Sequence, residues 1–166
     1  DLSPFSPNGI TREMVDEAFC LGGAGFRAQI LNNTLWISGE TASFQSRSLS
    51  VKMMLYTLTQ MFVLPDREFV VSLHDFPPPQ TRGEDLWPLF AMGKTRQHRG
   101  VILFPDHTFW NWKEARTASW PKTSAKLVGA SRALDWDSKI GKALFSGAPT
   151  SPVRMAIAKE AALRPD

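Results

Sequence analysis

The sequence predicts an α/β fold, because segments with helical periodicity alternate with short buried strands. Apolar residues recur at helical spacing over residues 48–62, and these positions are expected to face the core. Residues 69–73 form a short apolar and β-branched run bounded by turn-forming residues, which is typical of a buried strand. With 166 residues, the chain is long enough for one domain with a core, or for half of a two-domain protein.

The first elements are a short helix and a β-hairpin. Thr11 is placed to cap a helix that the glycines at positions 22 and 23 end. Residues 26–30 and 35–37 flank Asn32 and Asn33, two residues that tolerate positive φ, so this stretch predicts two strands joined by a tight turn. The amphipathic helix at 48–62 follows.

Strands dominate the middle of the chain and helices its end. The strand at 69–73 is stopped by the prolines at 77–79. The later elements are two strands at 89–92 and 101–104, an irregular aromatic segment at 107–121, a helix and a strand over 135–145, and a last helix that begins at Pro152.

Charge and composition exclude several classes of protein. The 19 basic and 16 acidic residues are spread without long runs of one sign, so no nucleic-acid partner is expected, and "GKTRQHRG" is interpreted as a solvated loop. A single cysteine excludes an internal disulfide framework, and three histidines on separate segments predict no metal site. No run reaches the roughly 20 apolar residues that span a bilayer, so no membrane segment is expected within the chain.

An N-glycosylation sequon, "NNT", begins at Asn32 in the predicted hairpin turn. It favours a secretory protein, although such triplets also occur by chance.

Candidate catalytic residues follow the predicted strands. Asp75 comes directly after the strand at 69–73 and before a proline-fixed turn, a place where a carboxylate can act as a general base, with His74 as a candidate partner. Asp106 follows the strand at 101–104 and has the same claim. The alternative for both is a turn residue that caps backbone N–H groups. Trp110 lies in the aromatic segment, either in the core or facing a cleft.

The stretch "SGAPTSPVR" predicts a phosphate site at the start of the last helix. Ser151 suits the N-cap, and Arg154 falls in the first turn, where the helix dipole disfavours a cation unless an anion binds beside it. Gly147 allows a close approach to the backbone, and Thr150 and Ser151 offer hydroxyls. The stretch lacks the Gly-Lys-Ser/Thr ending of a P-loop.

Three segments together resemble glycosyltransferase family 90, which includes Rumi-type protein O-glucosyltransferases and capsule-associated xylosyltransferases. They are "LPDREFVVSLHDFP", "PLFAMGKTRQHRGVILFPDHTFWNW" and "ALFSGAPTSPVR", in the family's order and approximate spacing. The resemblance runs from about Ile10 to the end of the chain. It implies a GT-B fold of two Rossmann-like halves, with residues 1–140 as the acceptor-side domain and 141–166 as the start of the donor-binding domain.

The resemblance also implies a reaction and a site. The family transfers a sugar, glucose or xylose, from a UDP-sugar to a protein or glycan hydroxyl, with inversion, without a metal and with no cofactor besides the donor. Asp75 matches the family's catalytic base, and Gly147, Thr150, Ser151 and Arg154 match its donor-site motif. The implied compartment is the lumen of the secretory pathway, the endoplasmic reticulum or Golgi.

One departure from the family motif keeps a second function open. Ser146 stands where the motif has an arginine that would stabilise the leaving diphosphate. A relative that has lost catalysis and binds a glycan or a protein is therefore the alternative.

Overall fold

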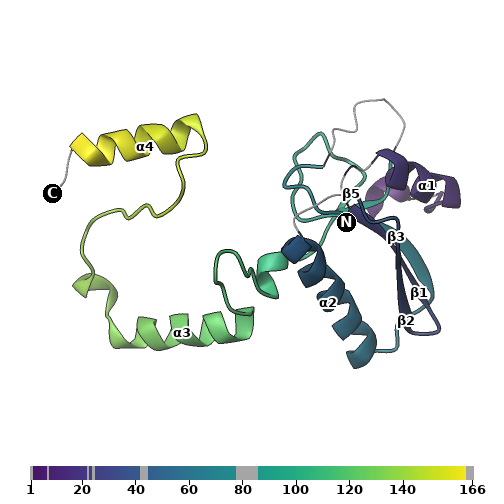
Figure 1. Cartoon of the computed structure of the whole chain (residues 1–166), viewed down its shortest axis with the longest axis horizontal. Coiled ribbons are helices and arrows are strands. Elements are labelled where there is room, and N and C mark those ends of the chain that lie inside the picture. Colours follow the sequence, from purple (N-terminus) through teal and green to yellow (C-terminus); the bar gives the residue numbers. More distant parts are fainter. Residues whose placement is uncertain are drawn as a thin grey trace. The chain divides into compact units, whose positions relative to one another are not determined.

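The computed structural model describes residues 2–6, 8–21, 23, 25–41, 45–77 and 86–163 (Figure 1). The chain divides into two compact units, Asp1–Val128 and Gly129–Asp166, called the first and second unit below. The expected boundary at residue 140 concerns the donor and acceptor halves of an enzyme, and it stays a prediction.

A five-stranded sheet in the order β2-β1-β3-β4-β5 forms the centre of the first unit. β1 pairs antiparallel with β2 and β3, whereas β3, β4 and β5 are parallel. The α/β prediction is therefore confirmed, with a mixed rather than a fully parallel sheet. The strands are β1 (Gly25–Leu31), β2 (Thr34–Ser38), β3 (Arg67–Ser72), β4 (Leu89–Ala91) and β5 (Val101–Leu103).

The hairpin of β1 and β2 turns at Asn32 and Asn33, as predicted, with φ values of 48° and 58°. The Asn33 side chain also ties the turn to the next helix and loop. Its Nδ2 donates to the Thr59 carbonyl at 2.7 Å, and its Oδ1 accepts from the Leu64 amide at 2.9 Å. Asn32, the sequon asparagine, is exposed.

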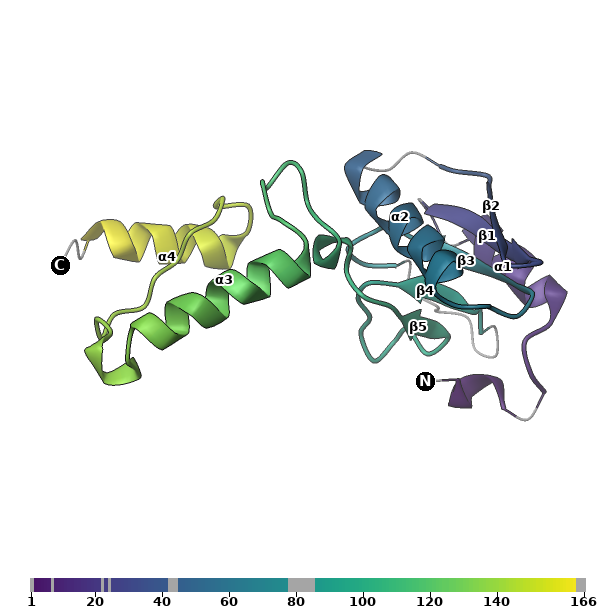
Figure 2. The same cartoon turned by 90° about the horizontal axis from the view of Figure 1, so that it is seen from below.

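Two helices cover opposite faces of this sheet (Figure 1, Figure 2). α1 (Arg12–Leu21) is capped by Thr11, whose Oγ1 accepts from the Met14 amide at 3.3 Å, and it packs on the strand residues Val70, Leu89 and Val101. α2 (Gln45–Met61) places Val51 against the alternate strand residues Phe26, Ala28 and Val71. The two-residue side-chain period of the strands thus separates the two halves of the core.

Not every apolar residue of α2 reaches the core. Val51 is buried, but Met61 is 66% exposed and Phe62, which follows the helix, is 55% exposed. The expectation that Met61 and Phe62 face the core is wrong, because both lie beyond the α2 residues that pack on the sheet, Val51, Met54 and Leu55.

Gly25 sits where β1 meets β3. A Cβ at this position would collide with the carbonyl oxygen of Val71 on the neighbouring strand. The Gly25 amide donates to Thr41 Oγ1 at 2.8 Å, and its carbonyl accepts from the Thr41 amide at 2.9 Å. Backbone packing therefore demands glycine here.

The chain after β5 differs most from the prediction. The 3₁₀ turn η2 (His107–Phe109) and α3 (Trp120–Ala133) follow, and the sequence analysis did not predict α3. The predicted helix over 135–145 is reduced to the 3₁₀ turn η3 (Trp136–Ser138), and the predicted strand is absent from these described residues. The apolar residues Ile140 and Leu144 of this stretch are 82% and 93% exposed, and among the described residues no strand pairs with it.

The last helix, α4 (Pro152–Leu163), begins at Pro152 as predicted. The remaining helical element is the 3₁₀ turn η1 (Ser3–Phe5), which precedes α1. Among the described residues, no helix is long and apolar enough to cross a membrane.

Candidate functional site

Asp75 lies just beyond the carboxyl end of β3. The residues from Val70 to Leu73 are buried, and the chain emerges from the sheet at His74. The Asp75 side chain is 73% exposed, and its Oδ1 lies 2.9 Å from Nη1 of Arg47. The carboxylate is therefore held on one side and open to solvent on the other.

Arg47 comes from the first turn of α2 and is only 7% exposed. Its Nη1 donates to the Leu73 carbonyl at 2.7 Å, in addition to its ion pair with Asp75. Sequence analysis missed this residue because the predicted helix starts at 48, one position after it. A single basic residue ahead of an amphipathic run carries no signal of its own.

Asp106 follows β5 and caps the turn η2. Its Oδ1 accepts from the Thr108 amide at 2.8 Å and lies 3.3 Å from Nδ1 of His107. Burial alone would raise the pKa of Asp106, but the hydrogen bonds from Thr108, with smaller contributions from the charges of His107 and Arg47, hold it below its ordinary value.

His107 is 3% exposed, and its Nδ1 also lies 3.3 Å from Sδ of Met92. Burial lowers the pKa of His107, an effect that Arg47 reinforces and that the Asp106 carboxylate only partly offsets. The ring packs edge-on against Trp112, with centroids 5.4 Å apart. Burial thus favours the neutral form of the His107 imidazole.

The two candidate carboxylates consequently differ in what they can do. Asp106 caps a turn, which is the alternative interpretation of these aspartates, and its Oδ1 already accepts the hydrogen bond from the Thr108 amide. The Asp75 side chain is 73% exposed, whereas that of Asp106 is 41% exposed. Asp75 is held by the side chain of Arg47, whereas Asp106 is held by a backbone amide. Asp75 therefore has more of its carboxylate open to a ligand than Asp106.

His74 does not pair with Asp75 in the way the sequence analysis suggested. Its ring lies against Gly23, and its amide is 3.4 Å from Ser72 Oγ. Arg47 occupies the role of partner instead.

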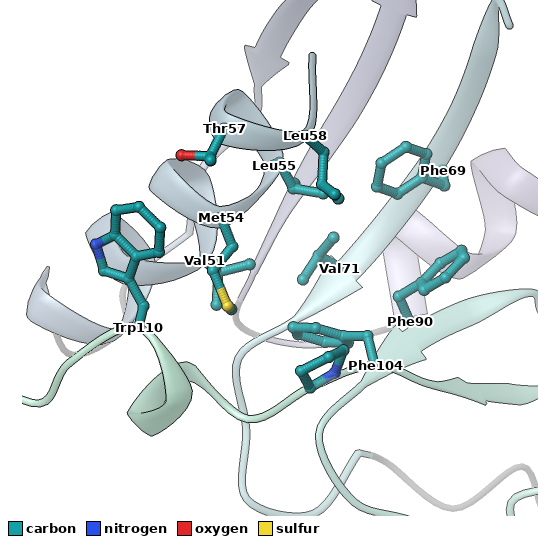
Figure 3. Close-up of a pocket in the computed structure, with 11 residues that line it drawn as sticks. Val51, Met54, Leu55, Thr57, Leu58, Phe69, Val71, Phe90, Phe104 and Trp110 are labelled. Carbon is teal, nitrogen blue, oxygen red and sulfur yellow. The ribbon is translucent and has the colours of Figure 1, made fainter. Parts of the chain in front are cut away.

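An apolar cavity of about 410 Å³ adjoins this site. Figure 3 shows Trp110 at its wall, facing Met54 and Val51 of α2. Phe104 and Pro105, which also line it, immediately precede Asp106. Trp110 is half-buried and directly follows the turn η2.

In the second unit, the start of α4 has the predicted cap. Ser151 Oγ accepts from the Arg154 amide at 3.3 Å, and Arg154 Nη1 donates to Thr150 Oγ1 at 3.0 Å. The ring of Phe145 lies beside Gly147, 3.2 Å from where a Cβ would be. Thr150, Ser151 and Arg154 therefore form one cluster at the helix N-terminus.

The described residues contain no group of three or more His, Cys, Asp or Glu side chains that could hold a metal ion.

The structure brings Asp75 and Asp106 to the same edge of the sheet in the first unit, and it brings Thr150, Ser151 and Arg154 together in the second.

The family model for glycosyl transferase family 90 matches residues 1–165. The chain belongs to glycosyl transferase family 90. Relatives in this family agree: protein O-glucosyltransferase 1 of Mus musculus is 30% identical over 164 residues, and that of Homo sapiens is 31% identical over 161 residues. An O-glucosyltransferase rumi homolog of Anopheles gambiae is 28% identical over 164 residues.

These matches cover 93% of this chain for the two mammalian relatives and 95% for the mosquito protein. The chain spans about 40% of the length of the mammalian relatives and 39% of the mosquito one. In this family 90 chain, the region matched by the family model includes Asp75 and the cluster of Thr150, Ser151 and Arg154 at the start of α4.

Proposed function

We propose that this chain is the acceptor-side half, with the start of the donor half, of an inverting glycosyltransferase. The enzyme would move glucose or xylose from a UDP-sugar to a hydroxyl of a protein or glycan acceptor, without a metal or other cofactor. The observation that carries the proposal is the Asp75 carboxylate, anchored at the end of β3 by Arg47 and 73% exposed. Family membership and the names of the relatives support it.

In this reaction Asp75 takes the proton of the acceptor hydroxyl while the oxygen attacks the anomeric carbon of the sugar. The bond from that carbon to the diphosphate oxygen breaks, and the nucleoside diphosphate leaves with the electron pair. A single displacement inverts the anomeric centre.

The donor diphosphate is assigned to the N-terminus of α4. The first-turn N–H groups and the Arg154 guanidinium would stabilise the charge that develops on the leaving group. Thr150 hydrogen-bonds the guanidinium at 3.0 Å, which supports its placement near this helix end.

The decisive test is transfer of labelled sugar from UDP-glucose and UDP-xylose to serine-containing acceptors by the complete protein that carries this chain. Asp75→Asn should lower transfer about 1,000-fold, because amide nitrogen cannot accept the proton, while nucleotide binding persists. Asp16→Asn, which alters a carboxylate paired with Arg27 on the other face of the sheet, is the matched control and should transfer sugar normally. Unchanged transfer by Asp75→Asn would remove Asp75 from the mechanism.

A second candidate is a glycan- or protein-binding module without catalysis. Ser146, in place of the arginine of the family motif, favours it, because a cation that stabilises the leaving diphosphate is missing. The variant Ser146→Arg distinguishes an enzyme with a weakened donor site from a binding module. A gain of nucleotide binding or transfer would support a weakened donor site, and no binding of nucleotide by either form would support the module.

The acceptor and the compartment follow from the relatives. Their names specify protein O-glucosylation, so a serine or threonine of a polypeptide is the favoured acceptor. We place the protein in the lumen of the endoplasmic reticulum or Golgi. A glycan on the exposed Asn32 of protein from its natural source would support that location.

A further inference from the structure

A buried arginine joins α2 to the end of β3 and to the proposed base. One nitrogen of Arg47, Nη1, lies 2.7 Å from the Leu73 carbonyl oxygen and 2.9 Å from Asp75 Oδ1. We propose that Arg47 is a positioning residue, which holds the Asp75 carboxylate in the one orientation that can receive the acceptor proton. The inference rests on the proposed function, because it gives Asp75 the role of base.

The Leu73 bond is what makes the arrangement rigid. Leu73 is 2% exposed and follows β3 directly, so its carbonyl is a fixed point of the fold. A guanidinium is planar, so a bond to this carbonyl restricts how it can face Asp75. The carboxylate is thereby positioned relative to the sheet rather than relative to a mobile surface side chain.

The exposure of the two partners indicates that the Arg47–Asp75 ion pair mainly orients the Asp75 carboxylate and adds little to the stability of the fold. The Arg47 side chain is 9% exposed, but that of Asp75 is 73% exposed, and ion pairs with one partner in water add little to folding stability. Without an anchor, an exposed aspartate samples several χ1 rotamers. Removing that freedom before the acceptor binds is a recognised source of rate enhancement.

The placement of Arg47 also serves the charge balance of the site. Its positive charge acts on Asp106 and His107 as well as on Asp75. Arg47, from α2, is therefore a positive charge near both candidate carboxylates, Asp75 after β3 and Asp106 before η2.

Kinetics of variants of the complete protein test the proposal. Arg47→Met should lower kcat for sugar transfer about 100-fold, the cost of a misplaced catalytic group, and leave KM for the UDP-sugar unchanged. Arg47→Lys should lose less, because an ammonium can keep one of the two contacts. In an Asp75→Asn background, Arg47→Met should cause no further loss.

Arg27→Met is the matched control. Arg27 is also a shielded, ion-paired arginine, with Asp16 at 2.7 Å and with Glu68, but its strand position faces α1 rather than α2. It should lower the melting temperature and leave kcat unchanged. A kcat for Arg47→Met equal to that of wild type, or a further loss in the Asp75→Asn background, would overturn the proposal.

Crystal structures of wild type and Arg47→Met give a readout that needs no activity. We expect one Asp75 rotamer in wild type, and a rotated or multiply placed carboxylate in the variant. An identical, single Asp75 rotamer in both would overturn the positioning role. If wild type transfers no sugar from either donor, the proposed function fails, and the two structures still decide whether Arg47 positions Asp75.

Discussion

At the level of single residues, His107 shows how burial sets the charge of this site. The ring is 3% exposed, and burial, reinforced by Arg47 and only partly offset by Asp106, holds its pKa below the ordinary 6.5. A histidine whose pKa is lower in the folded state contributes stability above its unfolded pKa, because at a pH between the two pKa values only the unfolded chain binds the proton. The stability it contributes is lost as the pH falls from above 6.5 towards the folded-state pKa.

We therefore expect the free energy of unfolding to fall as the pH drops below about 6.5, and His107→Gln to flatten that dependence. Glutamine cannot be protonated in this range, so the variant lacks this contribution. Urea unfolding at several pH values measures both curves. Parallel curves for wild type and variant would show that His107 is not the group responsible.

The residues of the site were predictable to different degrees. Asp75 and Asp106 could be named because each directly follows a recognisable strand. Their different roles could not, because capping by Asp106 depends on the 3₁₀ turn η2 and pairing of Asp75 depends on a helix that starts 30 residues earlier. Arg47 becomes visible only when α2 and β3 are in place.

At the level of elements, the β1–β2 hairpin is fastened to the rest of the first unit by its turn. Asn33 bonds the Thr59 carbonyl and the Leu64 amide, and the Asn32 amide donates to Asp66 Oδ1 at 2.8 Å. The turn therefore fixes where α2 ends and where β3 begins.

Two substitutions separate the backbone and side-chain roles of Asn33. Asn33→Gly keeps the positive φ and loses two hydrogen bonds, so it should destabilise the fold by about 2 kcal/mol. Asn33→Ala loses the same bonds and adds backbone strain of about 1 kcal/mol, so it should cost more. Denaturant unfolding measures both. Equal losses would show that the positive φ carries no cost here.

Elements with local signals were the predictable ones. The Asn-Asn turn, the Thr11 cap and the Ser151–Pro152 helix start each involve neighbours in sequence, and the structure has all three. The strand expected within 135–145 has no local turn or cap signal, and the apolar Ile140 in this stretch is exposed because no described strand pairs with it. α3 was overlooked, although its alanines, lysines and leucine are good helix formers.

At the level of the whole molecule, the two units differ in how they are stabilised. The first contains two buried clusters around α1 and α2. In the second, none of the described residues is buried, and apolar side chains such as Trp136, Val153 and Leu163 are exposed. A 12-residue helix without tertiary packing is marginal in water.

Separate expression of two fragments, divided after residue 134 so that α3 stays intact, tests this difference. Residues 1–134 should unfold cooperatively, whereas a peptide of residues 135–166 should show little helix by circular dichroism. The reason is that only the first carries a core that can offset the loss of chain entropy. Strong helicity in the isolated peptide would contradict this, as would a 1–134 fragment without a cooperative transition.

Gly25 affects how sequences of family 90 should be compared. Any side chain there would strike the β3 backbone, so selection will keep glycine whether or not a given member still transfers sugar. Glycine at this position in every member would therefore reflect the packing of the sheet and would not distinguish active from inactive members. If the proposed roles hold, Asp75, Arg47 and Ser146 are the positions whose residues should differ between members that transfer sugar and members that do not.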